Sequence, residues 1–294
     1  PTHYSPLYGL VNHGKILAFF NKQYKSLTMK TLIMTLMVVV LTTFSSNFNA
    51  CQAQNPYGEV NFVKIKPHMN ESFLIDMKTS KRLANARKAN KTINSWQLYR
   101  RVYPRGMDVD YDYATLSVFP SGVEMKAEGT WDSGVRELSV KEISDFLTSL
   151  GNNRTITATD LYTFRLGTGI NILPGEYVQL NLIKVKPGSH DAYEKLLETL
   201  KPVIDECVKA GKIKGFNVWK RTYATNVGSE NNYTVSFSFS TLDQALSWAS
   251  GKTSLADEYK KVYPKEDINV LNAKLRELRD LSSQELWELV DVTD

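Results

Sequence analysis

Short segments of hydrophobic and β-branched residues recur along the chain and predict eight β-strands. Residues 60–66 and 180–186 are two such segments, and they end at Pro67 and Pro187. Because proline cannot continue a strand ladder, each segment is predicted to be a strand followed by a turn. The other predicted strands are 95–103, 112–119, 160–166, 215–223, 233–239 and 285–292.

A helical period follows the first strand of each group. After Ser189, apolar residues recur at the spacing of one buried helix face, and Pro202 is expected to kink or split this helix. Residues 70–91 are more charged and predict the equivalent helix, anchored by Phe73, Ile75, Leu83 and Ala86. Capping boxes at Ser139/Glu142 and Thr241/Gln244 predict a second helical region in each group.

The two groups repeat each other at a fixed distance. Residues 57–67 align without a gap on residues 177–187, with five of eleven positions identical. The same offset of 120 places Tyr99-Arg-Arg-Val-Tyr103 on Trp219-Lys-Arg-Thr-Tyr223, and an offset of 125 pairs Arg154 with Arg279 and Leu161 with Leu286. The pattern predicts a tandem duplication.

Each copy has the element order β-α-β-β-α-β, which predicts an α+β fold of two tandem ferredoxin-like modules, residues 54–172 and 173–294. Helices cover one face of each sheet and leave the other face bare. Because a bare apolar face must be buried, we expect the two modules to pack sheet to sheet as an intrachain pseudo-dimeric barrel.

The sequence Lys184-Val-Lys-Pro-Gly188 follows a strand and precedes an amphipathic helix and a second strand that contains Trp219. This pattern resembles the dimeric α+β barrel superfamily, which includes antibiotic-biosynthesis-type monooxygenases and NIPSNAP-like proteins. The resemblance spans nearly all of residues 54–294 and implies a fused pseudo-dimer. The first copy departs from it, with Pro67-His68 where a glycine is expected. Because members of the superfamily differ in activity, the resemblance implies the fold and not the function.

The N-terminal part of the chain has a different character. Met29 and Lys30 precede an apolar run of 14 residues, Thr31 to Phe44, which is typical of a signal peptide. We expect residues 29–53 to be removed after Ala53, for periplasmic or secreted export, and residues 1–28 to be upstream, non-native translation. Lipidation at Cys51 is the alternative, and Phe48 disfavours it because a lipobox has a small aliphatic residue at that position.

Removal of residues 1–53 changes the charge balance, because this stretch holds four lysines and no acidic residue. Of the 36 basic residues, 32 remain against 31 acidic ones. The composition therefore gives no basis for binding nucleic acid or an anionic membrane, and no transmembrane segment is expected after Ala53. Only Cys207 remains, so no intrachain disulfide is expected.

Polar and aromatic residues that recur in both copies are the candidate ligand-binding residues. Asn61 and Asn181 lie within the first strand of each copy, where they either line a cavity between the sheets or bond a neighbouring strand. In the second strands, an arginine lies between aromatic residues on one face, an arrangement that binds a carboxylate or phosphate, or is purely structural. These residues are Tyr99, Arg101 and Tyr103 in the first copy and Trp219, Arg221 and Tyr223 in the second.

Other reactive residue types form no recognisable site. His68 and His190 have neither cysteines nor paired carboxylates near them in the sequence, so we expect solvated loop histidines and no metal site. Haem-binding members of the resembled superfamily use an axial histidine, and this resemblance makes His190 a weaker, second candidate for a haem ligand. Cys207 has the spacing of a buried helix residue. Asp108, Asp110 and Asp112 lack the glycine and glutamate of a calcium loop, and we expect a solvated hairpin.

Three functions are compatible with this pattern. The first is a module that holds a small, partly apolar molecule between the two sheets, without a cofactor. The second is a cofactor-independent enzyme of monooxygenase or isomerase type in the same cavity, whose catalytic residues and reaction the sequence leaves undefined. The third is a structural envelope protein whose inter-sheet space is filled with side chains. A cavity separates the third from the others, because a packed interior leaves no site.

Overall fold

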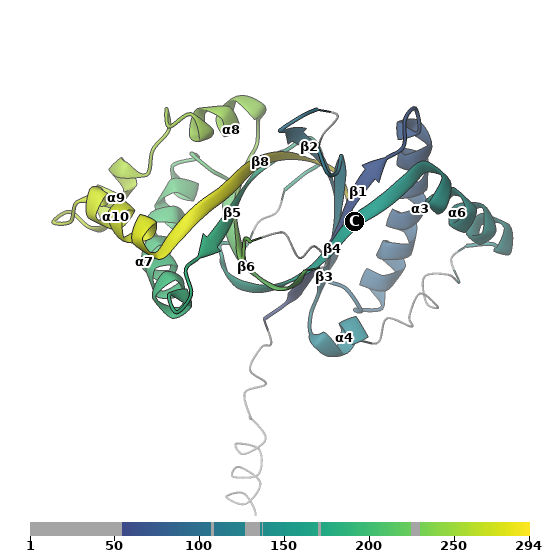
Figure 1. Ribbon diagram of the computed structural model, residues 1–294, viewed down its shortest axis with the longest axis horizontal. Helices are drawn as coiled ribbons and strands as arrows, with labels where there is room; N and C mark the ends of the chain where they lie inside the picture. The colour runs from purple at the N-terminus through teal and green to yellow at the C-terminus, as the bar shows by residue number, and fades with distance from the viewer. Residues whose placement is uncertain (1–54, 107–108, 127–135, 137, 170–171, 225–229) are drawn as a thin grey trace, which may run out of the picture. The chain divides into compact units, whose positions relative to one another are not determined.

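The structure is a computed structural model that describes residues 55–106, 109–126, 136, 138–169, 172–224 and 230–294. The expected leader, residues 1–53, and Asp108 lie outside the described residues. Residues 54–294 form one compact unit, in which eight antiparallel strands close into a barrel and helices lie outside it (Figure 1). The fold is therefore α+β, as the sequence predicts.

The strands follow the predicted segments closely, and two begin earlier than expected. The strands β1, β2, β3, β5, β6 and β7 each lie within two or three residues of the predicted bounds. The strands β4 and β8 are 14 residues long and start directly at Arg154 and Arg279, after a helix. The bounds are β1 Tyr57–Ile65, β2 Ser95–Tyr103, β3 Tyr113–Phe119, β4 Arg154–Gly167, β5 Tyr177–Val185, β6 Gly215–Ala224, β7 Tyr233–Phe239 and β8 Arg279–Val292.

Backbone hydrogen bonds close the barrel in the strand order β1-β3-β2-β8-β5-β7-β6-β4. The pairs β2–β8 and β4–β6 each join a strand from residues 55–169 to a strand from residues 172–294, and we call these two pairs the seams. The sheets are thus joined edge to edge, which goes further than the expected sheet-to-sheet packing. Closure leaves none of the eight strands with an unpaired edge.

The described residues contain seven helices, which cover the outer face of the barrel in two groups (Figure 1). After β1 and β5, respectively, come the long helices α3 Asn70–Ala89 and α7 His190–Lys209. The shorter helices are α4 Gly122–Lys126, α6 Val140–Asn153, α8 Leu242–Ala249, α9 Ala256–Val262 and α10 Ile268–Leu278. Within the described part of the chain, no helix combines the length and apolarity that crossing a membrane requires.

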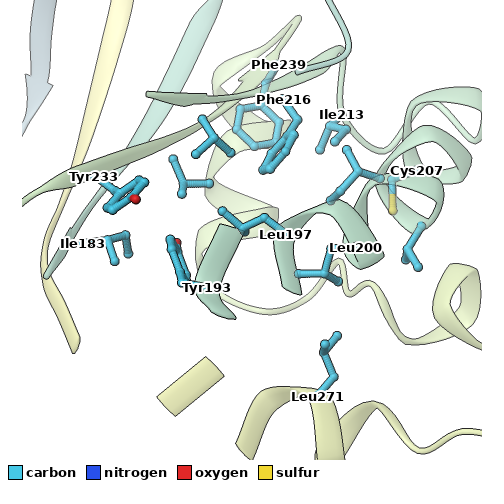
Figure 2. Close-up of a cluster of buried hydrophobic side chains, with 14 of the residues drawn as sticks. Ile183, Tyr193, Leu197, Leu200, Cys207, Ile213, Phe216, Tyr233, Phe239 and Leu271 are labelled. Carbon is cyan, nitrogen blue, oxygen red and sulfur yellow. The ribbon is translucent and has the colours of Figure 1, made fainter. Parts of the chain in front are cut away.

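Hydrophobic clusters lie both outside and inside the barrel. The largest packs α7 against the outer face of β5, β6 and β7, and it includes Tyr193, Phe216, Tyr233 and Phe239 (Figure 2). A second outer cluster packs α3 in the same way around Phe73. The third lies inside the barrel and includes residues from β1, β2, β4, β5 and β8. The helices therefore fix the sheet from outside, and the inner cluster lines the space that the strands enclose.

Two local predictions about the long helices need correction, and one about α6 is confirmed. Pro202 lies inside α7, which continues from His190 to Lys209 and is not split. Ile75 is exposed and does not anchor α3; Met77 is buried instead, because it lies one turn after Phe73 on the same face. Ser139 and Glu142 form the predicted capping box.

The Thr241/Gln244 box is incomplete. Thr241 Oγ1 accepts a hydrogen bond from the Gln244 backbone N–H. The Gln244 side chain, however, accepts from the backbone of Ser240, one residue before the cap.

Candidate functional site

A cavity of about 750 Å³ lies inside the barrel. This volume is within the range of about 300–1,000 Å³ that holds small-molecule ligands. The wall is largely aliphatic and aromatic, with residues from all eight strands, and Asp110 and Thr157 are exposed lining residues at which the cavity reaches the surface. The interior of the barrel is therefore not filled with side chains. Its apolar lining includes Val60, Phe62, Tyr99, Tyr111, Leu116, Tyr162, Val178, Leu180, Trp219 and Trp287.

Three of the residues singled out from the sequence line this cavity, namely Tyr99, Trp219 and Arg221. Tyr99 is buried, and its hydroxyl donates to Gln97 Oε1 at 2.7 Å. The Trp219 ring packs edge-on against Phe164 at 5.2 Å and lies over Gly58. A Cβ atom at Gly58 would lie 3.1 Å from this ring, so glycine makes room for the tryptophan.

Asn61 and Asn181 do not line the cavity. Side chains alternate along a strand, and Val60 and Phe62 face inward, so Asn61 faces outward. Asn61 accepts from Thr159 on β4 at 2.6 Å, and Asn181 accepts from Gln284 on β8 at 2.8 Å. The structure thus shows the alternative in which each amide bonds a neighbouring strand, and Asn181 also lines a smaller pocket outside the barrel.

Tyr103 and Tyr223 are also outside the cavity, with 51% and 72% of each residue exposed. The sequence places them on the same face as the arginine two positions earlier, but both seams are irregular at this point. The register shifts between Arg101 and Tyr103 in β2, and the β4–β6 register shifts opposite the end of β6. A bulge interrupts the alternation of side chains, so the two tyrosines leave the inner face.

Arg221 belongs to a buried polar cluster at the β4–β6 seam. Its Nη1 lies 3.4 Å from Asp160 Oδ2 and donates to Asn231 Oδ1 at 3.1 Å. The Tyr162 hydroxyl donates to the same Asp160 oxygen at 3.3 Å. All four side chains line the cavity, so this cluster offers both a cation and a carboxylate to a bound molecule.

Arg101 belongs to the corresponding cluster at the β2–β8 seam. Its Nη1 lies 3.8 Å from Glu285 Oε1, and the other oxygen of Glu285 accepts from the Tyr111 hydroxyl and, at 2.9 Å, from Trp287 Nε1. The Arg101 guanidinium also stacks 4.4 Å above the Tyr111 ring. Arg101 itself is not a lining residue.

The two clusters differ in one position that decides which arginine reaches the cavity. The offset of 120 aligns Tyr111 with Asn231. The large ring of Tyr111 stacks on Arg101 and lines the cavity in its place, whereas the smaller Asn231 leaves Arg221 in the lining. The polar groups that meet the cavity are therefore unevenly distributed, and most lie on the side of Arg221.

Asp160 carries an unused hydrogen-bond acceptor. The residue is only 4% exposed, and its Oδ1 has no hydrogen-bond partner among the described residues. A buried acceptor without a partner costs free energy unless a ligand or water satisfies it. This oxygen is therefore a specific point at which a bound hydroxyl or amine can donate.

Burial raises the pKa of Tyr99, Tyr111 and Tyr162 well above its usual range. For Tyr111 the neighbouring Glu285 carboxylate adds to the shift, and for Tyr162 Asp160 does so. All three hydroxyls therefore stay protonated at neutral pH and act as hydrogen-bond donors.

The histidines and the cysteine lie away from the cavity, and of the aspartates Asp110 lines its exposed end while Asp112 has another partner. His68 is exposed, whereas His190 is half-buried at the start of α7 with its ring 5.8 Å from Tyr233, so it is not a solvated loop residue. Cys207 is buried, and burial raises its thiol pKa to about 12. Asp112 accepts from the Ile65 backbone, which leaves it occupied. Within the described ranges, no three acidic, histidine or cysteine side chains gather as metal ligands.

Sequence reasoning missed the acidic partners of both arginines. Asp160 and Glu285 are related by the offset of 125, as are Tyr162 and Trp287. That offset also pairs the neighbouring leucines, Leu161 and Leu286, so the sequence alone could have shown that Asp160 and Glu285 are equivalent positions. What it did not show is that each arginine meets the acid of the other half of the chain, because this depends on the seams.

Comparison with models of known protein families gives no match, and neither does comparison with curated proteins. Solved structures do match. A "putative monooxygenase" from Lactobacillus acidophilus NCFM superposes with a TM-score of 0.51 at 10% identity, over 82% of this chain and 96% of that one. Another, from Fusobacterium nucleatum subsp. nucleatum ATCC 25586, has a TM-score of 0.50 at 8% identity, over 82% and 95%. At these identities the likeness shows the fold alone, which the chain shares with these two structures and which agrees with the resemblance seen in the sequence.

Proposed function

We propose that the protein binds a small, partly apolar molecule inside the barrel. The observation that carries this proposal is the cavity of about 750 Å³, enclosed by strands from both halves of the chain. An apolar wall with a few convergent polar groups is the usual form of a small-molecule site. The cavity also argues against a structural protein with a filled interior.

The polar cluster indicates how such a ligand is oriented. Its apolar body packs between Trp219, Trp287 and the aliphatic residues of β1 and β5, and a polar group meets Asp160 and Arg221. Asp160 Oδ1 accepts from a hydroxyl of the ligand, while the Arg221 guanidinium favours a partly negative oxygen. Phenols and aromatic alcohols have both features, and they form the ligand class that we favour.

The test uses 1-naphthol and the full chain. Because Trp219 and Trp287 line the cavity, binding is expected to change the tryptophan fluorescence. Ala158→Phe places a ring in the cavity and should weaken binding at least about tenfold, the equivalent of about 1.4 kcal/mol. Ala256→Phe, on the exposed start of α9, is the matched control and should bind as the unaltered chain does. Equal affinity in the two variants would contradict the site.

Asp160 also favours a second candidate, a cofactor-independent enzyme in the same cavity. A buried carboxylate with a free oxygen can take a proton from a carbon next to a ligand carbonyl, and Arg221 would hold the resulting enolate oxygen. With a β,γ-unsaturated ketone, return of the proton to the γ-carbon of the dienolate moves the double bond into conjugation and completes an isomerisation without any co-reactant. Deuterium exchange into 2-tetralone, followed by NMR in heavy water, should be faster with the protein than with Asp160→Asn. The same rate with both would exclude this role.

We also propose that the two halves, 54–172 and 173–294, arose by tandem duplication of a ferredoxin-like module. The element order of strands and long helices in residues 55–167 recurs in residues 177–292. The registers support this too, since Asn61 pairs with Thr115 in one half and Asn181 with Val235 in the other, at one offset of 120. Figure 1 lets the reader follow both halves by colour.

Export remains a proposal that rests on the sequence alone. We propose that residues 29–53 act as a signal peptide and that the exported chain begins at Gln54. Intact-mass measurement of the protein from the periplasm or medium should give the mass of residues 54–294. A chain that retains the apolar run in the cytoplasm would contradict the proposal.

A further inference from the structure

A second, smaller pocket of about 260 Å³ lies outside the barrel, between the outer face of β5 and β8 and the helices α7, α8 and α10. Its walls are largely apolar, and Figure 2 shows Tyr193 beside Ile183, with Leu197 and Leu200 further along α7. Ala249 and Asn272 line the pocket and are exposed, so it opens between α8 and α10. It shares no lining residue with the barrel cavity.

Arg279 gives this pocket a charge. It lines the pocket at the start of β8 and is half-buried, and its Nε is buried without a hydrogen-bond partner. Among the described residues, Arg279 interacts electrostatically with the Tyr193 hydroxyl, which is not an anion, and no ion pair to its guanidinium is found. A cation in a partly apolar environment is costly unless an anion accompanies it.

The equivalent arginine in the first half of the chain has a carboxylate partner that Arg279 lacks among the described residues. The offset of 125 aligns Arg279 with Arg154, which starts β4 in the same way. Arg154 Nη1 lies 3.7 Å from the buried Asp76 on α3, and Asp76 in turn accepts from Asn153 at 2.6 Å. In the second half the residues that correspond to Asp76 and Asn153 are Leu196 and Leu278. The arginine has been kept while its counter-ion has been replaced by leucine.

The opposite end of the pocket contains another unsatisfied group. Gln179 is 5% exposed, lines the pocket, and its Oε1 has no hydrogen-bond partner among the described residues. Arg279 pairs with Val185, six positions along β5 from Gln179, which is roughly 20 Å at about 3.3 Å per residue. The pocket therefore has a cation near one end of its β5 wall and a buried amide near the other.

We propose that this pocket is a second binding site, for a small linear carboxylic acid, with the carboxylate on Arg279. The ligand supplies the negative charge that Asp76 supplies to Arg154, and its alkyl chain lies along α7 toward Gln179. The volume of about 260 Å³ is just below the range of drug-sized ligands, which fits an acid of medium chain length.

Calorimetric titration of the full chain with octanoate tests the site. Arg279→Gln should weaken octanoate binding at least about tenfold, because it removes a charged hydrogen-bond donor. Arg276→Gln removes the same charge from an exposed position one turn earlier on α10, and it should leave the affinity unchanged within about twofold. Leu196→Asp gives Arg279 an internal carboxylate like the one that Asp76 gives Arg154. This carboxylate should compete with octanoate for Arg279 and lower the octanoate affinity by a similar factor.

Two further measurements test the proposed site even if one of these variants fails to fold. The unaltered chain should bind octanoate at least about tenfold more tightly than octanol, which lacks the carboxylate. Equal affinity for the two would overturn the proposal. Octanoate that entered the barrel would instead lose affinity in Ala158→Phe, and that result would overturn the second site while leaving the barrel site intact.

Discussion

At the scale of single residues, the ion pairs at the seams connect the two halves of the chain. Arg221 comes from β6 and Asp160 from β4, and both side chains are at most 10% exposed. When one partner of a buried ion pair is removed, the other charge stays buried and unpaired. The resulting loss of stability is larger than the net stability that the intact pair provides. Removing both partners together should therefore be tolerated better than removing one.

Asp160→Ala is expected to destabilise the protein by about 3 kcal/mol, the lower end of the range for breaking a buried pair, because Asn231 still accepts from Arg221. The double variant Asp160→Leu/Arg221→Met should recover most of this loss. Urea unfolding followed by circular dichroism measures both. A double variant less stable than Asp160→Ala would show that the pair itself provides net stability.

The sequence identified Arg221 and its flanking tryptophan by the repeat, and both line the cavity. It could not place Tyr223, because a bulge in the β4–β6 pairing changes the direction of the strand end. Nor could it place Asn61, since the periodicity of β1 does not say which of its two apolar faces meets the helices. Partners across the seams, such as Asp160, depend on register between distant strands, which a single sequence does not show.

At the scale of elements, strands and helices were predicted best where hydrophobic periodicity is strong. The strand β2 has its predicted bounds, and α7 is continuous although it contains Pro202. The early parts of β4 and β8 were missed because their residues are largely exposed and carry little apolar pattern. They are strands because β1 and β5 provide backbone partners over this length.

The contacts of Glu142 at the start of α6 should make the stability of the fold depend on pH. The hydrogen bond from Arg82, with the backbone and hydroxyl of Ser139, lowers the pKa of Glu142 to about 2. Because the pKa in the folded state is lower than the unfolded value of about 4.3, the carboxylate stabilises the fold above that pH. This contribution is lost as the pH falls toward about 2.

Glu142→Gln should therefore lower the urea midpoint at pH 7, and the difference from the unaltered chain should shrink between about pH 4.3 and 2. Glu277→Gln, which removes an exposed carboxylate from α10, serves as the control. A difference that stayed constant over this range would show that the capping contacts do not depend on the charge.

At the scale of the whole molecule, both halves of the chain contribute four strands each to one closed barrel. The seams β2–β8 and β4–β6 occupy equivalent places, so two copies of one half should be able to close a barrel as well. Residues 173–294 expressed alone are expected to form a dimer in which β6 of each copy pairs with β8 of the other. Sedimentation equilibrium measures this, and a stable monomer would contradict the equivalence of the seams.

The α+β fold class could be predicted at this scale from the order of strands and helices, whereas the closure of all eight strands into one barrel depends on the seams. The cavity could not be predicted, because its volume depends on how Trp219, Tyr111 and their neighbours fill the space between the strands. The second pocket was not predicted either. It becomes visible only when Arg279 is compared with Arg154 in three dimensions, because Arg154 forms an ion pair with Asp76 and no such pair of Arg279 is found among the described residues.

The strand β8 pairs with β5 on one side and with β2 on the other. Until residues 279–292 pair, the edges of β2 and β5 that β8 covers are both open. Open edges invite pairing with other chains. A variant truncated before Arg279 should therefore aggregate instead of forming a smaller folded protein, because the edges of β2 and β5 stay uncovered and can pair with other chains.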